Sequence, residues 1–268
     1  MTKRLGRLPS IYLAVVFIIL YAPIFYLIYY SFNSAGNMHS FEGFTLDWYR
    51  EVLQDTRLFI ILLNTLVIAL LSSAISTVLG VFGALAIKGV KTKRFQNALL
   101  TLNNVMIVSP DVIIGASFLV LFAIVGMELG FGSVLISHIA FSVPIVVLMV
   151  LPNLEEMSPS LIDAARDLGA SRWDVLTRVI IPYISPGIFA GFFMALTYSL
   201  DDFVVTFFVT GSGFSTLSVE IYSLARRGIS LTINALSTLV FLATLLLVIG
   251  YYLISKQRTK PKEVRSVG

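Results

Sequence analysis

Long apolar stretches alternate with short polar connections along most of the chain. A helix rises about 1.5 Å per residue, so about 20 apolar residues cross a hydrocarbon core about 30 Å thick. Six stretches have this length: Ile11–Phe32, Leu58–Ile87, Asn97–Val125, Gly132–Leu151, Pro186–Phe208 and Ile233–Ser255. The pattern therefore predicts an all-α, polytopic membrane protein with six transmembrane helices.

The first apolar stretch follows Lys3, Arg4 and Arg7, a pattern that also occurs at the start of a signal peptide. Its apolar run is longer than that of a signal peptide, and no cleavage site of small residues follows at residues 32–37. We therefore expect this stretch to remain as the first transmembrane helix.

Composition and charge agree with a membrane protein and predict its orientation. Hydrophobic residues make up 57% of the chain and charged residues 13%, whereas a soluble domain is about 25% charged. Of the 19 Lys and Arg residues, 15 lie in the N-terminus, residues 88–97, residues 152–185 and the C-terminal tail. Because cytoplasmic connections are enriched in basic residues, both termini are expected in the cytoplasm. We interpret the net charge of +4 as a topology signal, with no nucleic acid as partner.

Several kinds of chemistry are missing from the sequence. The chain has no cysteine, which excludes disulfides, thiolate catalysis and thiolate metal sites. It also has no G-x-x-x-x-G-K-[ST] phosphate loop and no catalytic constellation. We therefore expect no enzyme activity, cofactor or metal site in this chain.

The connection at residues 152–185 is long, mixed in polarity and predicts two short helices. The dipeptide Ser158-Pro159 is a helix start, with serine as N-cap and proline at the first helical position. Gly169 is expected to end this helix as a left-handed cap, and Ser171–Asp174 to begin the second as a capping box. The second helix is expected to stop at Pro182.

Three interpretations fit this connection: a plain amphipathic hairpin, a DNA-binding helix-turn-helix, or a docking element for another subunit. Attachment to the membrane at both ends and a nearly balanced charge disfavour DNA binding. The third interpretation rests on Asp163-Ala164-Ala165, then Gly169, then Val179-x-Ile181-Pro182, which resembles the EAA loop of ABC-importer permeases. The spacing and the position before the penultimate span match, with Asp163 in place of glutamate.

This resemblance implies that residues 152–185 form a coupling loop, whose helix docks in a groove of a separate ATPase subunit that binds ATP-Mg. The small alanines allow close helix approach, and glycine allows a sharp turn. The positions that match the motif are Asp163, Ala164, Ala165, Gly169 and Pro182. Arg172 stands near the turn where an acid is expected, so the details of docking stay open.

Four ionisable residues fall within the predicted spans: Asp111, His138, Asp201 and Asp202. Such residues are costly in a membrane and functional by default. Pro110 is expected to break the third span just before Asp111. Asp111 and Asp201 lie about 14 and 15 residues into spans that both run outward, so they are expected to meet at one depth. With no Lys or Arg in any span, a cation or protons must neutralise these acids, and Tyr198 would flank an amine.

A structural role is the alternative for each of these residues. Asp111 would then cap a half-helix after Pro110, and one of Asp201 and Asp202 would bond to backbone or to a partner subunit. Because adjacent residues point about 100° apart on a helix, both acids need not face one pathway. His138 stands alone among small and apolar residues, so we interpret it as a hydrogen-bonded packing residue.

Trp48 lies in an aromatic segment, residues 44–49, of the first outer connection. One interpretation is an aromatic anchor at the membrane interface. The other is contact with a substrate or with a binding protein, and the sequence favours neither.

Three further segments extend the resemblance to nearly the whole chain: residues 45–49, 109–111 and 199–203. Together with the coupling loop, they resemble the permease subunits of spermidine/putrescine ABC importers. The resemblance implies a single permease domain, residues 1–268, in a bacterial inner membrane. It implies a homologous second permease subunit, two cytoplasmic ATPase subunits and an extracytoplasmic polyamine-binding protein as partners. It also implies a polyamine pathway, with candidate residues Trp48, Asp111, Tyr198, Ser199, Asp201 and Asp202.

Two rival functions stay open. The coupling loop is widely shared, so the solute is a polyamine or another compound, such as another amine or an iron complex. A proton- or sodium-coupled carrier would use the same acids as ion sites. The coupling loop and the lack of an internal repeat count against this carrier.

Overall fold

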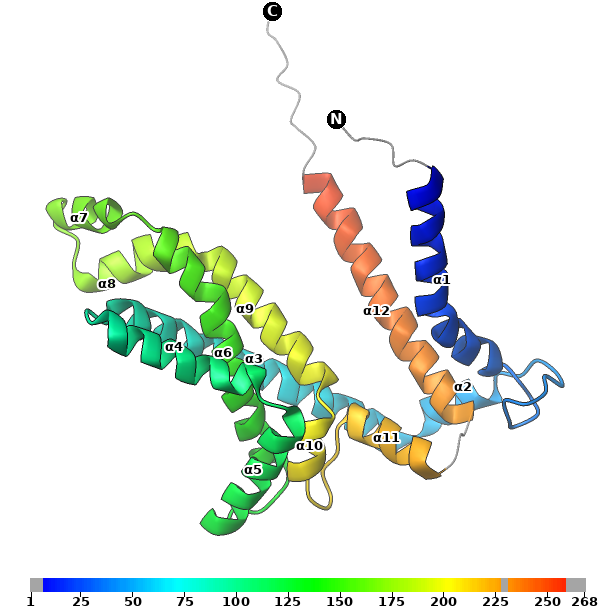
Figure 1. Ribbon diagram of the computed structural model, residues 1–268. Helices are drawn as coiled ribbons and strands as arrows, with labels where there is room; N and C mark the ends of the chain where they lie inside the picture. The colour runs from blue at the N-terminus through cyan, green and yellow to red at the C-terminus, as the bar shows by residue number, and fades with distance from the viewer. Residues whose placement is uncertain (1–6, 228–230, 259–268) are drawn as a thin grey trace, which may run out of the picture. The chain divides into compact units, whose positions relative to one another are not determined.

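The computed structural model describes residues 7–227 and 231–258, and all regular elements in these ranges are helices (Figure 1). The first half contains α1 (Arg7–Tyr30), α2 (Asp47–Gln54), α3 (Thr56–Gly89), α4 (Lys93–Val108), α5 (Asp111–Val125) and α6 (Phe131–Glu156). The second contains α7 (Pro159–Asp167), α8 (Arg172–Asp174), the π-helical turn η1 (Val175–Ile180), α9 (Ile181–Asp201), α10 (Val204–Val209), α11 (Leu217–Arg227) and α12 (Leu231–Arg258). The all-α fold class is confirmed. The basic residues Lys3 and Arg4 and the tail after Arg258 lie outside the described residues.

Several of these helices can cross a membrane. Four are long and apolar enough within the described residues: Ile11–Tyr30, Thr56–Gly89, Phe131–Glu156 and Arg172–Asp201. The helices α4 and α5 qualify together as one span bent by 102°. The polytopic class is therefore confirmed. The helix α12 covers the sixth predicted stretch, but its described apolar part, Leu231–Leu246, is shorter than a full span, so the number six stays a prediction.

Contacts divide the chain into a central unit, residues 57–220, and a flanking unit made of the described residues of 1–56 and 221–268. In the flanking unit, buried Asn33 organises the loop after α1. Its side-chain amide donates to the carbonyl oxygens of Asn37 and Ser40, at 2.7 and 2.6 Å. The indole Nε1 of Trp48 donates to the Asn33 carbonyl at 2.8 Å. Trp48 therefore has a structural role within its own unit.

The core of the central unit lies between α3, α6 and α9 (Figure 1). Its apolar cluster includes Ala84 of α3, Val146 of α6 and Ile184 of α9, all fully buried. Small residues allow the backbones of membrane helices to approach closely. A Cβ added at Gly187 of α9 would lie 2.8 Å from the carbonyl oxygen of Met149 of α6. The packing of α9 on α6 therefore requires glycine at this position.

Gly187→Ala is expected to lower the stability of the folded protein. The added methyl group would push α9 away from α6, and overpacking of this kind costs about 1–3 kcal/mol. Gly89→Ala is the matched control, because a Cβ there would meet no heavy atom within 4 Å. The midpoint temperature of thermal denaturation in detergent is measured for both variants. Equal midpoints for the two variants would contradict the packing argument.

Two spans are broken in the middle. The expected break before Asp111 is confirmed: α4 ends at Val108, and Ser109 has an extended backbone with ψ of 139°. The second break lies between α9 and α10, where Asp202 has an extended backbone with ψ of 120°. The prediction of one continuous helix over residues 186–208 was therefore wrong. Apolar residues lie on both sides of Asp201 and Asp202, so the hydropathy of the whole stretch did not reveal this break.

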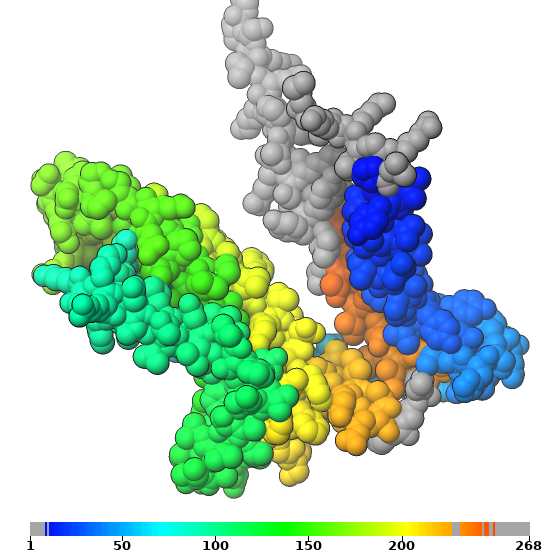
Figure 2. All heavy atoms as spheres, viewed as in Figure 1, coloured from blue at the N-terminus to red at the C-terminus, as the bar shows by residue number. Residues whose placement is uncertain are grey.

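The helices α4 and α5 lie on the surface of the central unit (Figure 2). Exposed apolar side chains include Val105 and Val108 of α4 and Ile124 of α5. Such a surface is compatible with lipid or with other subunits, but it would be unusual in contact with water.

Residues 152–185 form the predicted helical pair at one end of the central unit (Figure 1). Ser158 is the N-cap residue of α7 and Pro159 its first residue, although the Ser158 hydroxyl bonds to Ser160 at 2.7 Å and caps no backbone N–H. Gly169 has φ of +84°. The N–H of Ala170 donates to the carbonyl of Ala165, five residues earlier, as in a Schellman cap. The predicted left-handed cap is confirmed.

The second helix of the pair begins as expected but ends elsewhere. Its N-cap Ser171 and Asp174 form a reciprocal capping box, with the Asp174 N–H donating to the Ser171 hydroxyl at 3.2 Å. The helix does not stop at Pro182, and that prediction was wrong. It continues to Asp201, because the π-helical turn at Val175–Ile180 absorbs the backbone mismatch that proline introduces. The second helix of the pair thus continues without a break into a membrane-length helix.

Candidate functional site

A small pocket of about 150 Å³ lies where the two helix breaks of the central unit meet. Its lining comes from the start of α5 and from the α9–α10 break: Asp111, Tyr198, Asp201, Asp202, Phe203 and Val204. The expectation that Asp111 and Asp201 meet is therefore confirmed. The 102° bend between α4 and α5, rather than a straight third span, leads the chain to this point.

Asp111 is the first residue of α5, where the positive end of the helix dipole favours a carboxylate. The Tyr198 hydroxyl donates a hydrogen bond to Asp111 Oδ1 at 2.9 Å. The Tyr198 ring packs edge-on against Phe141, with 5.0 Å between ring centroids. Tyr198 thus links α9 to the start of α5 and presents an aromatic ring beside two acids.

The adjacent acids Asp201 and Asp202 have different surroundings. Asp201 is exposed, whereas the side chain of Asp202 is only 5% exposed. Asp202 Oδ2 accepts hydrogen bonds from the Thr206 backbone N–H at 2.8 Å and from the Thr206 hydroxyl at 2.7 Å. Asp202 thereby provides a hydrogen-bond acceptor for a backbone N–H group in the first turn of α10, where such groups lack a partner within the helix. The two acids therefore have separate tasks, which their adjacency in sequence does not reveal.

His138 is fully buried in α6 and is hydrogen-bonded through both ring nitrogens, as expected of a packing histidine. Its Nδ1 lies 2.7 Å from the Ser199 hydroxyl, and its Nε2 lies 2.8 Å from the Thr206 hydroxyl. The same Nε2 lies 3.5 Å from Asp202 Oδ2. His138 is therefore a buried hydrogen-bonding neighbour of Asp202, a partner that the sequence pattern did not indicate.

Two predicted pathway residues are not among those that line this pocket. Ser199 is buried, and its hydroxyl bonds to His138 and, at 3.0 Å, to Ser72 of α3. Trp48 belongs to the flanking unit, where it contacts Asn33. The pocket therefore unites four of the six predicted residues.

The pocket carries unbalanced negative charge. Within the part of the chain that the structure describes, neither Asp111 nor Asp201 forms an ion pair. No group of three or more His, Cys, Asp or Glu residues suited to a metal ion occurs in the described ranges. Two carboxylates beside aromatic rings suit an organic cation.

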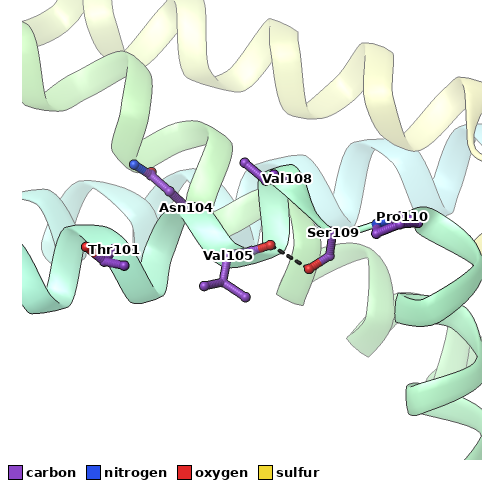
Figure 3. A pocket seen from close by; sticks show the side chains of 6 residues that line it. All are labelled: Thr101, Asn104, Val105, Val108, Ser109 and Pro110. Atoms are coloured by element: carbon purple, nitrogen blue, oxygen red, sulfur yellow. Dashed lines mark hydrogen bonds between the residues drawn. The ribbon is translucent and has the colours of Figure 1, made fainter.

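A groove of about 510 Å³ runs along α4 up to Pro110, one residue before Asp111 (Figure 3). Its lining combines polar and apolar residues: Thr101, Asn104, Val105, Val108, Ser109 and Pro110. The Ser109 hydroxyl donates to the Val105 carbonyl at 2.6 Å, so it is already used inside the helix. Asn104 also lines the groove, and its Oδ1 accepts a hydrogen bond from the Asn103 amide at 3.3 Å.

The residues of the EAA-like motif lie on an exposed end of the central unit. Asp163 and Ala164 are exposed on α7, and the turn at Gly169 follows. Leu168 is 89% exposed and Trp173 69% exposed, which is unusual for large apolar side chains outside a membrane span. This end of the unit therefore has the properties of a protein contact surface.

An all-helical chain with several spans, broken helices and carboxylates at the breaks defines a membrane permease. Residues 76–260 match the family described as binding-protein-dependent transport system inner membrane component, and the chain belongs to that family. It is thus a multi-pass inner-membrane permease component of an ABC transporter, not an enzyme.

Two curated relatives and one solved structure illustrate the match. The chain is 36% identical over 251 residues to the spermidine/putrescine transport system permease protein PotC of Escherichia coli strain K12, covering 93% of this chain and 94% of PotC. It is 32% identical over 258 residues to the putrescine transport system permease protein PotI of the same strain, covering 94% and 91%. A chain of a bacterial ABC transporter that imports the acidic polysaccharide alginate has the same fold, with 21% identity, 94% coverage of both chains and a TM-score of 0.70.

Proposed function

We propose that this chain is a permease subunit of an ATP-driven importer that carries polyamines of the spermidine and putrescine class into the cytoplasm. The observation that carries the proposal is the pair Asp111 and Asp201, two carboxylates at adjoining helix breaks that form no ion pair within the described residues. The similarity to PotC and PotI supports the same substrate class.

The chemistry of the pocket suits a flexible polycation. A carboxylate binds a primary or secondary ammonium group through charge-assisted hydrogen bonds. The ring of Tyr198 lies beside Asp111 and offers a face for an ammonium group or a methylene stem. Several carboxylates along a path allow the amines of one molecule to move from site to site, so that binding need not prevent release.

The proposed topology has six spans in one permease domain, residues 1–268, with both termini in the cytoplasm. Fifteen basic residues on one side of the membrane support this orientation. Residues 152–185 then lie on the cytoplasmic side, next to the site of ATP hydrolysis.

The proposed partners are a homologous second permease subunit, two cytoplasmic ATPase subunits that bind ATP-Mg, and an extracytoplasmic polyamine-binding protein. Asp163, Ala164, Ala165, Gly169 and Pro182 form the proposed coupling element. The continuous helix Arg172–Asp201 supports this assignment, because this one rod joins the coupling element to the acidic pocket. Closure of the ATPases would move this rod, open the pathway outward and admit the substrate; hydrolysis would reset it.

Uptake by the assembled complex tests the proposal. We expect proteoliposomes with the complete complex and its binding protein to accumulate radiolabelled spermidine or putrescine only with internal ATP-Mg. An ionophore that abolishes ion gradients is expected to leave uptake unchanged. ATP-dependent uptake of another amine or an iron complex instead would reject the substrate class, and uptake driven by an ion gradient without ATP would reject the importer.

A further inference from the structure

One buried group that the proposed pathway does not use is His138, in the first half of α6. We propose that His138 and Asp202 are a positioning pair, which holds the α9–α10 break in place and leaves Asp201 as the substrate-facing acid of that break. This inference deepens the proposed function and rests on it, because the substrate that Asp201 faces is the polyamine proposed above. It concerns how two adjacent aspartates divide their tasks.

The first argument is the geometry around His138. The imidazole is fully buried and lies between α9 and α10, bonded to Ser199 of the one and Thr206 of the other. It therefore contacts the chain on both sides of the break. Ser199 also bonds to Ser72 of α3, so the network joins three spans to the short helix α10.

The second argument is the placement of protons. A threonine hydroxyl has one hydrogen, and that of Thr206 is donated to Asp202 Oδ2. The Thr206 oxygen must then accept from His138, so Nε2 of His138 carries a hydrogen. The imidazole N–H, the threonine hydroxyl and the carboxylate thus form one directed chain. Asp202 Oδ2 accepts the last hydrogen bond of this chain, from the Thr206 hydroxyl, and also the hydrogen bond from the Thr206 backbone N–H.

The third argument concerns which carboxylates remain available to a ligand. Asp202 also accepts from the Val205 N–H through Oδ1 at 3.3 Å, so both carboxylate oxygens are engaged by the protein. Asp201, one residue earlier, is the last residue of α9 and is exposed. The backbone leaves the helix at Asp202, which separates the two carboxylates and directs only Asp202 into the network. The pocket therefore offers Asp111 and Asp201 to a cation.

The first arm of the test uses the absence of native cysteine. Asp201→Cys and Asp202→Cys are made separately in the full complex and treated with a cationic trimethylammonium-ethyl methanethiosulfonate. We expect the thiol at position 201 to be modified at least about tenfold faster than that at 202, because the latter is buried and bonded inward. Equal rates would overturn the inference. This arm requires no polyamine, so a complex that shows the difference but carries no polyamine rejects only the proposed substrate.

The second arm tests positioning through His138 itself. His138→Gln keeps a side-chain N–H donor toward Thr206, whereas His138→Phe keeps a ring of similar size without any donor. We expect the KM for uptake to rise about tenfold or more in His138→Phe with similar protein in the membrane, and glutamine to restore most of the affinity. An unchanged KM in His138→Phe would contradict the inference. If the phenylalanine variant fails to assemble, the labelling rates decide.

Discussion

Asp201→Asn is expected to reduce polyamine uptake by about 100-fold, mainly through a higher KM. Asparagine has nearly the same size, so the variant removes charge with little change of shape. A hydrogen bond to a charged group is worth about 1.5–3 kcal/mol, which is roughly one to two factors of ten. We expect the loss of uptake to lie at the upper end of this range, because the site lies in a span where water screens charge poorly.

Asp111→Asn is expected to have a similar effect, and the double variant a larger one, since both carboxylates face one pocket. Initial rates over a range of spermidine concentrations, in proteoliposomes with equal amounts of complex, separate KM from the maximal rate. Glu128→Gln is the matched control: it also removes one negative charge, but Glu128 is exposed between α5 and α6 and lies outside the pocket. Native uptake in Asp201→Asn would mean that the substrate takes another route.

Ala164→Trp is expected to abolish ATP-driven uptake while leaving the chain itself folded. Ala164 is exposed on α7, so a large side chain disturbs no packing within this subunit. A groove that accepts small alanines would exclude tryptophan, and the ATPase would neither bind firmly nor transmit its motion. We expect uptake to fall by about 100-fold or more, because docking is required for every cycle.

Arg166→Trp is the control for this variant. Position 166 is about 200° around the helix from 164, so the same bulk points to the opposite side. Arg166 is also exposed. Co-purification of the ATPase with the permease, together with its polyamine-stimulated ATP hydrolysis, measures coupling directly. Equal loss in both variants would show a general defect of α7 instead of a docking surface.

Much of the fold followed from local signals in the sequence. Five of the six apolar stretches correspond to membrane-length helices or a bent helix pair, because about 20 apolar residues have few alternatives to a span. The turn at Gly169 and the capping box at Ser171 also followed, since each depends on residues within one or two helical turns. Pro110 indicated the break before Asp111 for the same reason.

One error had a local cause and the other depended on distant parts of the chain. The end predicted at Pro182 was wrong because a π-helical turn accommodates the proline within a longer helix. No proline lies next to the break after Asp201, so no local sequence signal marks it. It depends on hydrogen bonds from Thr206 and on His138, which is more than 60 residues away in sequence.

The sequence by itself determined the class of protein, the approximate spans, the capped helical pair and the four ionisable residues within the spans. These depend on hydropathy and on neighbours a few residues apart, which a linear pattern records. Only the tertiary structure decided that Asp202 is bonded inward to Thr206 and His138 while Asp201 stays open beside Asp111. The reason is physical: the surroundings of a carboxylate are set by groups on α5, α6 and α10, and two adjacent aspartates are equivalent until those helices pack.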